Sequence, residues 1–162
     1  MGARSPLIDP YVAEKLTPVA RATVVYLDDD PVSRELLVEF FRLLPELDLV
    51  TARTAHEARA AIIEHRPAIV VSDAWMGDVS SDRFVIEILS SPRLEAPAVV
   101  ILSADANAST IARFRRLGVS TYLPKPIELC RLSDVLHELA RTGELQNERI
   151  ESNARSNAAS GN

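Results

Sequence analysis

The stretch TVVYLDDDP, residues Thr23–Pro31, joins a β-branched apolar run to three consecutive aspartates. Val24–Leu27 is apolar or aromatic at every position, which is typical of a parallel strand buried on both faces of a sheet. In open α/β sheets, ligands bind beyond the carboxyl ends of the strands. The sequence therefore predicts a buried strand whose carboxyl end carries an acidic site made of Asp28, Asp29 and Asp30.

Similar apolar segments recur along the chain and alternate with segments of helical periodicity. The five expected strands are Thr23–Leu27, Leu47–Ala52, Ala68–Ser72, Ala98–Leu102 and Val119–Leu123. The apolar stripes of the five expected helices begin at Leu36, Ala55, Phe84, Ile111 and Leu129. This alternation predicts an α/β fold with a five-stranded parallel sheet and helices on both of its faces.

Composition narrows the class of protein. The chain has 162 residues, of which 47% are apolar and 25% charged, as in an ordinary globular protein. A net charge of −5 argues against a broad nucleic-acid surface, and the lone Cys130 excludes an internal disulfide. No apolar run approaches the roughly 20 residues of a membrane span, and no secretory signal is evident. We therefore expect a cytoplasmic protein.

The chain divides into three parts by composition. Residues 1–22 contain three prolines and little periodicity, and we expect a leader or linker there. Residues 23–142 hold all the alternating segments and form the expected domain. Residues 143–162 are rich in Ser, Asn and Ala, which favours a flexible C-terminal tail.

Chemically active side chains follow four of the five expected strands. They are Asp28, Asp29 and Asp30 after the first, Asp73 after the third, Ser103 after the fourth and Lys125 after the fifth. Carboxylates that share one edge repel one another unless a cation lies among them, and an oxygen-only donor set suits Mg²⁺ or Mn²⁺. A divalent ion, an ammonium and a hydroxyl around one carboxylate suit phosphoryl transfer.

Each of these features also has an ordinary structural explanation. The three aspartates could cap the following helix, Asp73 could open a turn, Ser103 could cap the fourth helix, and Lys125-Pro126 could be a solvated turn. Their joint placement at one edge of a single sheet favours a common site.

Four segments carry a resemblance to a known family: VVYLDDDPVSR (Val24–Arg34), IVVSDAWM (Ile69–Met76), VVILSA (Val99–Ala104) and LGVSTYLPKP (Leu117–Pro126). Together they resemble the receiver domain of response regulators in bacterial two-component and phosphorelay signalling. The resemblance implies a flavodoxin-like, doubly wound sheet. It also implies a phosphoprotein switch rather than an enzyme, with Mg²⁺-dependent self-phosphorylation and autodephosphorylation only.

The resemblance assigns a role to seven positions. Asp73 would accept a phosphoryl group from a histidine kinase or phosphotransfer protein and form an aspartyl phosphate. The Mg²⁺ ligands would be Asp28, Asp29, Asp73 and the backbone carbonyl of Trp75. Ser103 would hydrogen-bond the phosphoryl group, Lys125 would pair with its oxygens through a loop with a cis Lys125-Pro126 bond, and Tyr122 would be the aromatic switch.

The implied switch changes a surface rather than a substrate. Phosphorylation would repack the face of the fourth helix, fifth strand and fifth helix, which would control a downstream protein and is where two copies could pair. Arg113, Arg115 and Arg116 lie on the fourth helix, either as a docking patch for an acidic partner or as a solvated face.

The loop after Asp73 departs from the family pattern. Gly77 replaces the usual proline and Ser80-Ser81 the usual Asp-Gly, so we expect a loosened loop. Trp75 is large enough to shield an acyl phosphate from water, and Asp105 would oppose that effect by orienting a hydrolytic water.

Alternatives remain open at this stage. A haloacid-dehalogenase-like phosphatase would use Asp28, Ser103 and Lys125, but it needs a further acidic pair at a strand end and leaves Asp73 without a role. A degenerate receiver would bind a partner without phosphorylation. The chain is either a stand-alone regulator or a receiver taken from a hybrid sensor kinase.

Overall fold

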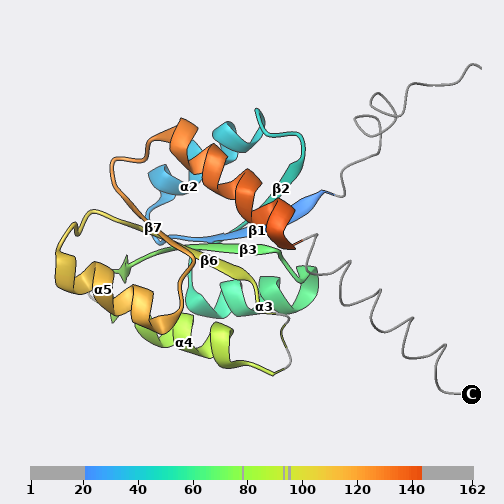
Figure 1. Ribbon diagram of the computed structural model, residues 1–162. Helices are drawn as coiled ribbons and strands as arrows, with labels where there is room; N and C mark the ends of the chain where they lie inside the picture. The colour runs from blue at the N-terminus through green and yellow to red at the C-terminus, as the bar shows by residue number, and fades with distance from the viewer. Residues whose placement is uncertain (1–20, 78, 93, 95, 144–162) are drawn as a thin grey trace, which may run out of the picture.

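Five parallel strands form the centre of the protein. The computed structural model describes residues 21–77, 79–92, 94 and 96–143 (Figure 1). The strands are β1 (Ala22–Leu27), β2 (Leu47–Ala52), β3 (Ile69–Asp73), β6 (Ala98–Ser103) and β7 (Thr121–Pro124). Their order in the sheet is β2-β1-β3-β6-β7, and every neighbouring pair is parallel. The predicted five-stranded, doubly wound parallel sheet is confirmed.

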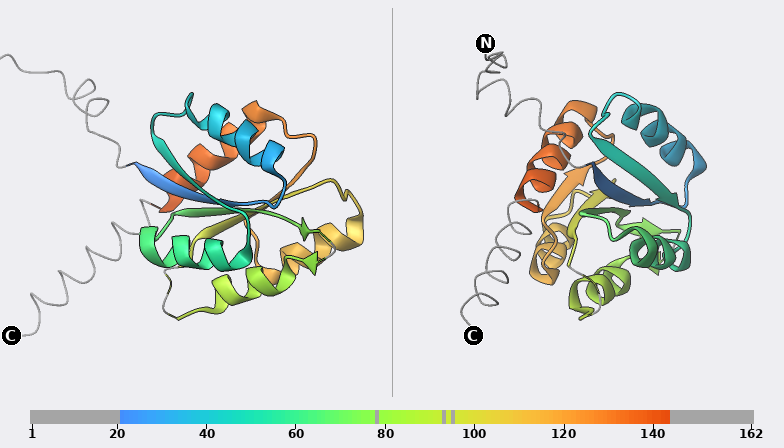
Figure 2. Two further views of the ribbon diagram at one scale, coloured as in Figure 1. Left: turned by 180° about the vertical axis from the view of Figure 1, so that it is seen from behind. Right: turned by 90° about the vertical axis from the view of Figure 1, so that its right-hand side faces the viewer.

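Five helices in the described part of the chain cover both faces of this sheet. They are α2 (Pro31–Phe41), α3 (Ala55–His65), α4 (Asp82–Ser90), α5 (Ala108–Leu117) and a helix over residues 129–143, here called the 129–143 helix. Figure 2 shows α2 and the 129–143 helix on one face and α3, α4 and α5 on the other. None of the described helices is long and apolar enough to cross a membrane.

The strand side chains alternate between two cores, as the period of a β-strand requires. Val24 and Tyr26 of β1 pack into the core under α2 and the 129–143 helix, where Leu132 and Leu136 also lie. Val25 and Leu27 face the opposite way, toward α3. Because Asp28 continues the alternation of Val24 and Tyr26, its side chain lies on the same side of the sheet as that of Tyr26.

Local signals place the ends of the helices. Asp30 caps α2 by accepting a hydrogen bond from the backbone N–H of Ser33, and Pro31 occupies the first turn, where its missing N–H costs nothing. Gly118 ends α5 with a φ of 97°, a left-handed conformation that glycine adopts without strain. These caps position the loops that carry the site.

The loop after Asp73 forms a structure that the sequence analysis did not predict. Strands β4 (Trp75–Met76) and β5 (Val79–Ser80) pair as a short antiparallel hairpin. Gly77 in its turn has a φ of +59°, which proline cannot adopt. The expectation of a loosened loop at Gly77 stays a prediction.

The described structure reaches into both expected flanking segments. β1 begins at Ala22, in the expected leader, and the 129–143 helix includes Gly143, in the expected tail. Residues 1–20 and 144–162 lie outside the described residues. The fifth strand begins at Thr121 rather than Val119, because Val119 and Ser120 lead from α5 into it.

Candidate functional site

Three carboxylates converge at the carboxyl edge of the sheet. β1 and β3 are neighbours, so Asp28 and Asp29 after β1 come next to Asp73 at the end of β3. One oxygen from each of the three carboxylates lies within 4.8 Å of the others. The structure thus brings together the three acids that the sequence predicted as metal ligands.

Lys125 lies among these acids. Its Nζ donates hydrogen bonds of 3.0 Å to Oδ2 of Asp28 and 3.0 Å to Oδ2 of Asp73. The backbone N–H of Lys125 donates to the carbonyl of Ser103, and the expected cis Lys125-Pro126 bond is confirmed. Burial acts to lower the pKa of Lys125, but its hydrogen bonds with both carboxylates outweigh burial and raise that pKa above its ordinary value. The ammonium is therefore charged at neutral pH.

Asp28 is fully buried and held by a dense set of donors. The hydroxyl of Tyr26 donates to its Oδ2 at 2.5 Å, and the backbone N–H of Asp30 donates to its Oδ1 at 2.9 Å. Arg34 donates to the backbone carbonyl of Asp28 at 2.7 Å. Sequence reasoning missed Tyr26 and Arg34, although the i, i+2 spacing of Tyr26 and Asp28 along a strand already places both on one side.

The hairpin after Asp73 orients the residues beside that carboxylate. The backbone N–H of Trp75 donates to Oδ1 of Asp73 at 3.2 Å. The backbone N–H of Ser81 donates to the carbonyl of Ala74. In an antiparallel ladder, hydrogen-bonded pairs alternate with pairs that make no backbone hydrogen bond to each other, so the next pair, Trp75 and Ser80, is of the second kind. The hairpin therefore does not use the carbonyl oxygen of Trp75.

The three consecutive aspartates divide into two roles. Asp30 is the cap of α2, so the ordinary structural explanation holds for that residue. Asp28 and Asp29 belong to the acidic site, and Asp29 is the exposed member. The turn of the hairpin passes close by, since a Cβ built on Gly77 would lie 3.8 Å from Oδ2 of Asp29.

Ser103 is buried at the end of β6 and does not cap a helix. Its Oγ accepts a hydrogen bond of 3.0 Å from the backbone N–H of Asp105. The cap of α5 is Asn107 instead. The ordinary explanation for Ser103 is therefore wrong, and its hydroxyl is bonded to the backbone of the loop that follows β6.

Tyr122 is bound to that same loop. Its hydroxyl donates to the backbone carbonyl of Asp105 at 2.5 Å, and its ring lies 5.9 Å from that of Phe114. Burial is the main cause that raises the pKa of Tyr122. The expected switch residue thus connects the loop after Ser103 with α5.

The carboxylate of Asp105 is occupied within its own loop. Oδ1 accepts from the backbone N–H of Asn107 and Oδ2 from the hydroxyl of Thr110, both at 2.8 Å. These two contacts, the Asn107 bond first, lower the pKa of Asp105. The structure therefore gives no support to the hypothesis that Asp105 orients a hydrolytic water.

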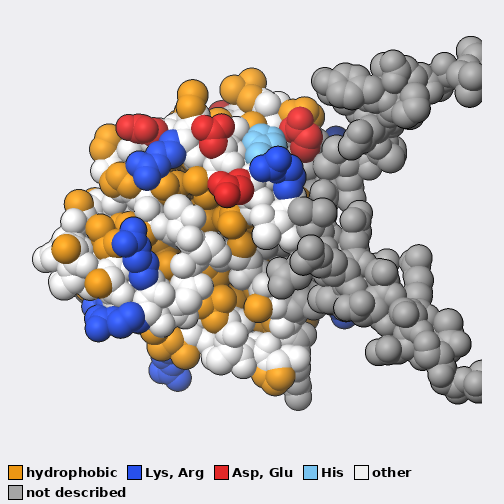
Figure 3. All heavy atoms as spheres, in the orientation of Figure 1, with side chains coloured by type: hydrophobic (Ala, Val, Ile, Leu, Met, Phe, Trp, Pro, Cys, Tyr) orange, Lys and Arg blue, Asp and Glu red, His pale blue; other side chains and the backbone are white. Residues whose placement is uncertain are grey.

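The arginines of α5 separate into two environments. Nε of Arg113 lies 3.0 Å from Oδ2 of Asp82 on α4. The central carbon of its guanidinium lies 5.4 Å from the centre of the Phe114 ring. Arg115 and Arg116 are exposed. Figure 3 shows Lys and Arg side chains gathered on the α5 side of the molecule. Arg113 therefore joins two helices, whereas the other two arginines remain available to solvent.

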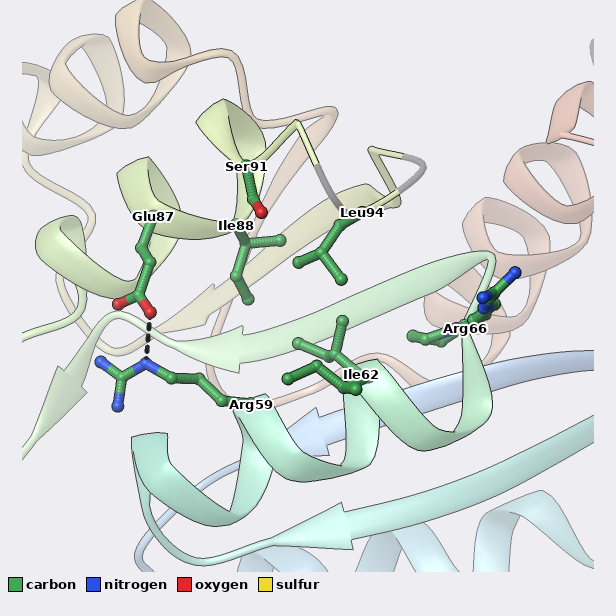
Figure 4. A pocket seen from close by; sticks show the side chains of 9 residues that line it. Arg59, Ile62, Arg66, Glu87, Ile88, Ser91 and Leu94 are labelled. Carbon is green, nitrogen blue, oxygen red and sulfur yellow. Dashed lines mark hydrogen bonds and ion pairs between the residues drawn. The ribbon is translucent and has the colours of Figure 1, made fainter.

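A hollow of about 360 Å³ lies between α3 and α4, apart from the acidic site. Figure 4 shows Arg59 and Glu87 joined at one side of it, with the side chains of Ile62, Ile88 and Leu94 beside this pair. None of the sequence-predicted site residues lines this hollow.

The donor set of the acidic site fits a hard divalent cation. Asp28, Asp29 and Asp73 offer carboxylate oxygens only. Oxygen ligands without His or Cys suit Mg²⁺ or Mn²⁺ rather than zinc.

Comparison with known proteins identifies the class to which this fold and site belong. Residues 24–137 match the family described as response regulator receiver domain, and the chain belongs to that family. It is therefore a phosphoacceptor signalling domain of the two-component type.

Individual relatives are similar over most of the described domain. The transcriptional regulatory protein CitB of Klebsiella pneumoniae is 27% identical over 120 residues, which are 74% of this chain and 50% of CitB. A probable chemotaxis protein CheY of Rhizobium etli is 25% identical over 118 residues, 73% of this chain and 87% of that protein. The match thus spans about half the length of relatives such as CitB.

Solved structures show the same fold. The signal receiver domain of a Luxo repressor protein from Vibrio parahaemolyticus superposes with a TM-score of 0.71 at 20% identity, covering 78% of this chain and 95% of that one. A response regulator receiver protein from Pseudomonas putida superposes with a TM-score of 0.65 at 29% identity, covering 74% of this chain and 98% of that one.

Proposed function

We propose that Asp73 is the phosphoacceptor and that residues 23–142 act as the receiver domain. The observation that carries this proposal is the position of Lys125, whose ammonium bonds Asp28 and Asp73 together. An ammonium held at that position can neutralise charge on a phosphoryl group attached to Asp73. The side chain of Asp73 is also partly open to solvent, whereas that of Asp28 is fully buried.

The proposed reaction is a phosphoryl transfer from a phosphohistidine. A carboxylate oxygen of Asp73 attacks phosphorus, the new O–P bond forms, and the N–P bond to the imidazole breaks. The electron pair remains on the imidazole nitrogen, which takes a proton from solvent. Lys125 balances the charge that develops on the phosphoryl oxygens, and positioning and electrostatics supply most of the rate enhancement.

Mg²⁺ is the proposed metal, with Mn²⁺ as a substitute. Asp28, Asp29, Asp73 and the carbonyl oxygen of Trp75 would hold it. The bound ion would supply positive charge to the phosphoryl oxygens. We assign to the chain only this self-phosphorylation and the later autodephosphorylation.

Ser103 and Tyr122 are the proposed switch residues. In the described conformation both are bonded to the backbone of Asp105, Ser103 as acceptor and Tyr122 as donor. A phosphoryl group brings about −1.5 to −2 charges to Asp73, and the hydroxyl of Ser103 would turn to donate to it. That movement would release the Asp105 loop and shift the population toward a second arrangement of Tyr122.

The implied partners act on two different surfaces. A histidine kinase or phosphotransfer protein would meet the acidic site. A downstream protein, or a second copy of the chain, would meet the face of α5, β7 and the 129–143 helix. We place this reaction in the cytoplasm, which holds the ATP on which a histidine kinase depends.

A phosphate-affinity gel tests the proposal against its alternatives. Wild type incubated with Mg²⁺ and a small phosphodonor such as acetyl phosphate should shift, and the Asp73→Asn variant should not. A wild-type chain that never shifts would support a degenerate receiver. Turnover of a phosphate ester that depends on Asp28 and survives Asp73→Asn would support a phosphatase, although the full burial of the Asp28 carboxylate and its hydrogen bond from the Tyr26 hydroxyl do not suit a nucleophile.

A further inference from the structure

Tyr26 brings a hydroxyl to the acidic site from inside the protein. Its side chain is fully buried in the core beneath α2 and the 129–143 helix, together with Leu37 and Leu132. The remaining described residues of β1 that point into this core are aliphatic. A valine or leucine would fill such a position without requiring a hydrogen-bond partner, so the hydroxyl needs an explanation of its own.

That hydroxyl donates to a single atom of the site. It lies 2.5 Å from Oδ2 of Asp28, which also accepts from Nζ of Lys125 at 3.0 Å. The other carboxylate oxygen of Asp28 accepts from the backbone N–H of Asp30 at 2.9 Å. Three donors from three different parts of the chain therefore fix the plane of this carboxylate.

Because Tyr26 is buried, its hydrogen bond restricts the orientation of the Asp28 carboxylate. The ring is fixed by the core around it and the hydroxyl is shielded from bulk water, so it cannot exchange Asp28 for solvent. A carboxylate that already has the orientation needed to bind a metal loses less freedom when the metal binds. Residues that hydrogen-bond a metal ligand in this way commonly change metal affinity 10- to 100-fold when they are mutated.

We propose that Tyr26 is a positioning residue for the metal site, which holds the Asp28 carboxylate through its buried hydroxyl and thereby sets the affinity for Mg²⁺. This inference rests on the proposed function, because Asp28 is a metal ligand only within it. Tyr26 itself touches neither the metal nor the phosphoryl group; it acts through Asp28.

The chain carries its own probe for the test. Trp75 is its only tryptophan, and its backbone is bonded to the Asp73 carboxylate, so we take the change in its fluorescence as the signal of Mg²⁺ binding. Tyr26→Phe removes one oxygen atom and keeps the ring that fills the core. Ser72→Ala is the matched control, because it deletes a buried hydroxyl on the neighbouring strand that donates to the backbone carbonyl of Asp73 rather than to a carboxylate of the site.

Mg²⁺ titrations of the three proteins should separate a positioning role from a structural one. We expect the Kd of Tyr26→Phe to rise about tenfold and that of Ser72→Ala to stay at the wild-type value. With a small phosphodonor, the Mg²⁺ concentration that gives half the maximal phosphorylation rate should rise in parallel, while the rate at saturating Mg²⁺ changes little. Thermal unfolding of the metal-free proteins confirms that all titrations are made on folded chains.

Two results would overturn the inference. A Kd for Tyr26→Phe equal to or below that of wild type would show that the hydroxyl does not prepare Asp28 for the metal, even if the variant unfolds at a lower temperature. A wild-type chain that binds no Mg²⁺ would contradict the proposed metal site and this inference with it. The first result leaves the proposed function intact, so the two failures are distinguishable.

Discussion

Nζ of Lys125 lies 3.0 Å from Oδ2 of Asp73, although 52 residues separate them in the sequence. The contact exists because β3 and β7 end at the same edge of the sheet, on either side of β6. The described conformation thus already holds a compact positive charge beside the proposed phosphoacceptor. The site needs no large rearrangement to place that charge on a phosphoryl oxygen.

Replacing Lys125 with Arg tests whether a compact ammonium is required. A planar guanidinium cannot place a single point charge within hydrogen-bond distance of both Asp28 and Asp73. We expect Lys125→Arg to fold and to bind Mg²⁺. In the phosphorylated protein, the equilibrium constant for the change to the second arrangement of Tyr122 should fall about tenfold, which corresponds to roughly 1.4 kcal/mol. NMR of fluorotyrosine-labelled protein measures this equilibrium. A Tyr122 signal that moves on phosphorylation as fully as in wild type would contradict the role given to Lys125.

The lifetime of the phosphorylated state should depend on Trp75. Its backbone is bonded to Asp73, and its large side chain is available to cover an acyl phosphate from water. Trp75→Ala should shorten the dephosphorylation half-life about two- to tenfold, which corresponds to roughly 0.4–1.4 kcal/mol in the barrier. Decay of phosphate-labelled protein after removal of the donor gives the half-life. An unchanged or longer half-life would rule out shielding.

The hairpin after Asp73 should require a residue that tolerates a positive φ at position 77. Gly77 has a φ of +59°, and a Cβ there meets only ordinary contacts, so backbone strain alone decides the cost. Gly77→Ala should destabilise the protein by about 1–2 kcal/mol. Gly77→Asn should cost less, because asparagine tolerates the left-handed region better than alanine does. Chemical denaturation of both variants checks the order, and equal costs would argue against strain.

The loop that holds Tyr122 should weaken in acid. Hydrogen bonds from Asn107 and Thr110 lower the pKa of Asp105 in the folded state. Its stabilising contribution is therefore present above 3.8, the ordinary pKa of this carboxyl, and is lost as the pH falls through the lower folded value.

Thr110→Val removes one of these hydrogen bonds and tests the prediction. The variant should be less stable than wild type at neutral pH, and the difference in unfolding free energy should shrink once Asp105 is protonated in both proteins. Its Asp105 pKa, followed by NMR, should lie above that of wild type. A stability difference independent of pH would show that Thr110 acts by packing alone.

Much of this architecture can be predicted from the sequence because the signals are local. The continuous apolar run from Val24 to Leu27 identified a buried parallel strand, and the residues directly after each strand identified Asp28, Asp73 and Lys125. Parallel strands end at a shared edge, which predicted a common site, whereas the pairing of β1 with β3 that sets Asp28 beside Asp73 is seen only in the structure.

The features that sequence reasoning missed depend on distances between side chains. The hairpin at Gly77 has strands of two residues each, too short for any periodicity. The hydrogen bond between Tyr26 and Asp28 joins a core side chain to a side chain of the site. A hydropathy pattern assigns Tyr26 to the core and Asp28 to the surface, so it does not predict a contact between them. The occupation of the Asp105 carboxylate by Thr110 depends on the path of the loop into α5, which composition does not specify.

The most direct test of the central claim is to locate the phosphoryl group. Wild type is treated with acetyl phosphate and Mg²⁺, the acyl phosphate is reduced with borohydride, and the product is mapped by peptide mass spectrometry. The account predicts homoserine at position 73 in wild type with Mg²⁺, and none when Mg²⁺ is chelated or when Asp73 is replaced by asparagine. Modification at Asp28 in place of Asp73, or no modification under any condition, would contradict it.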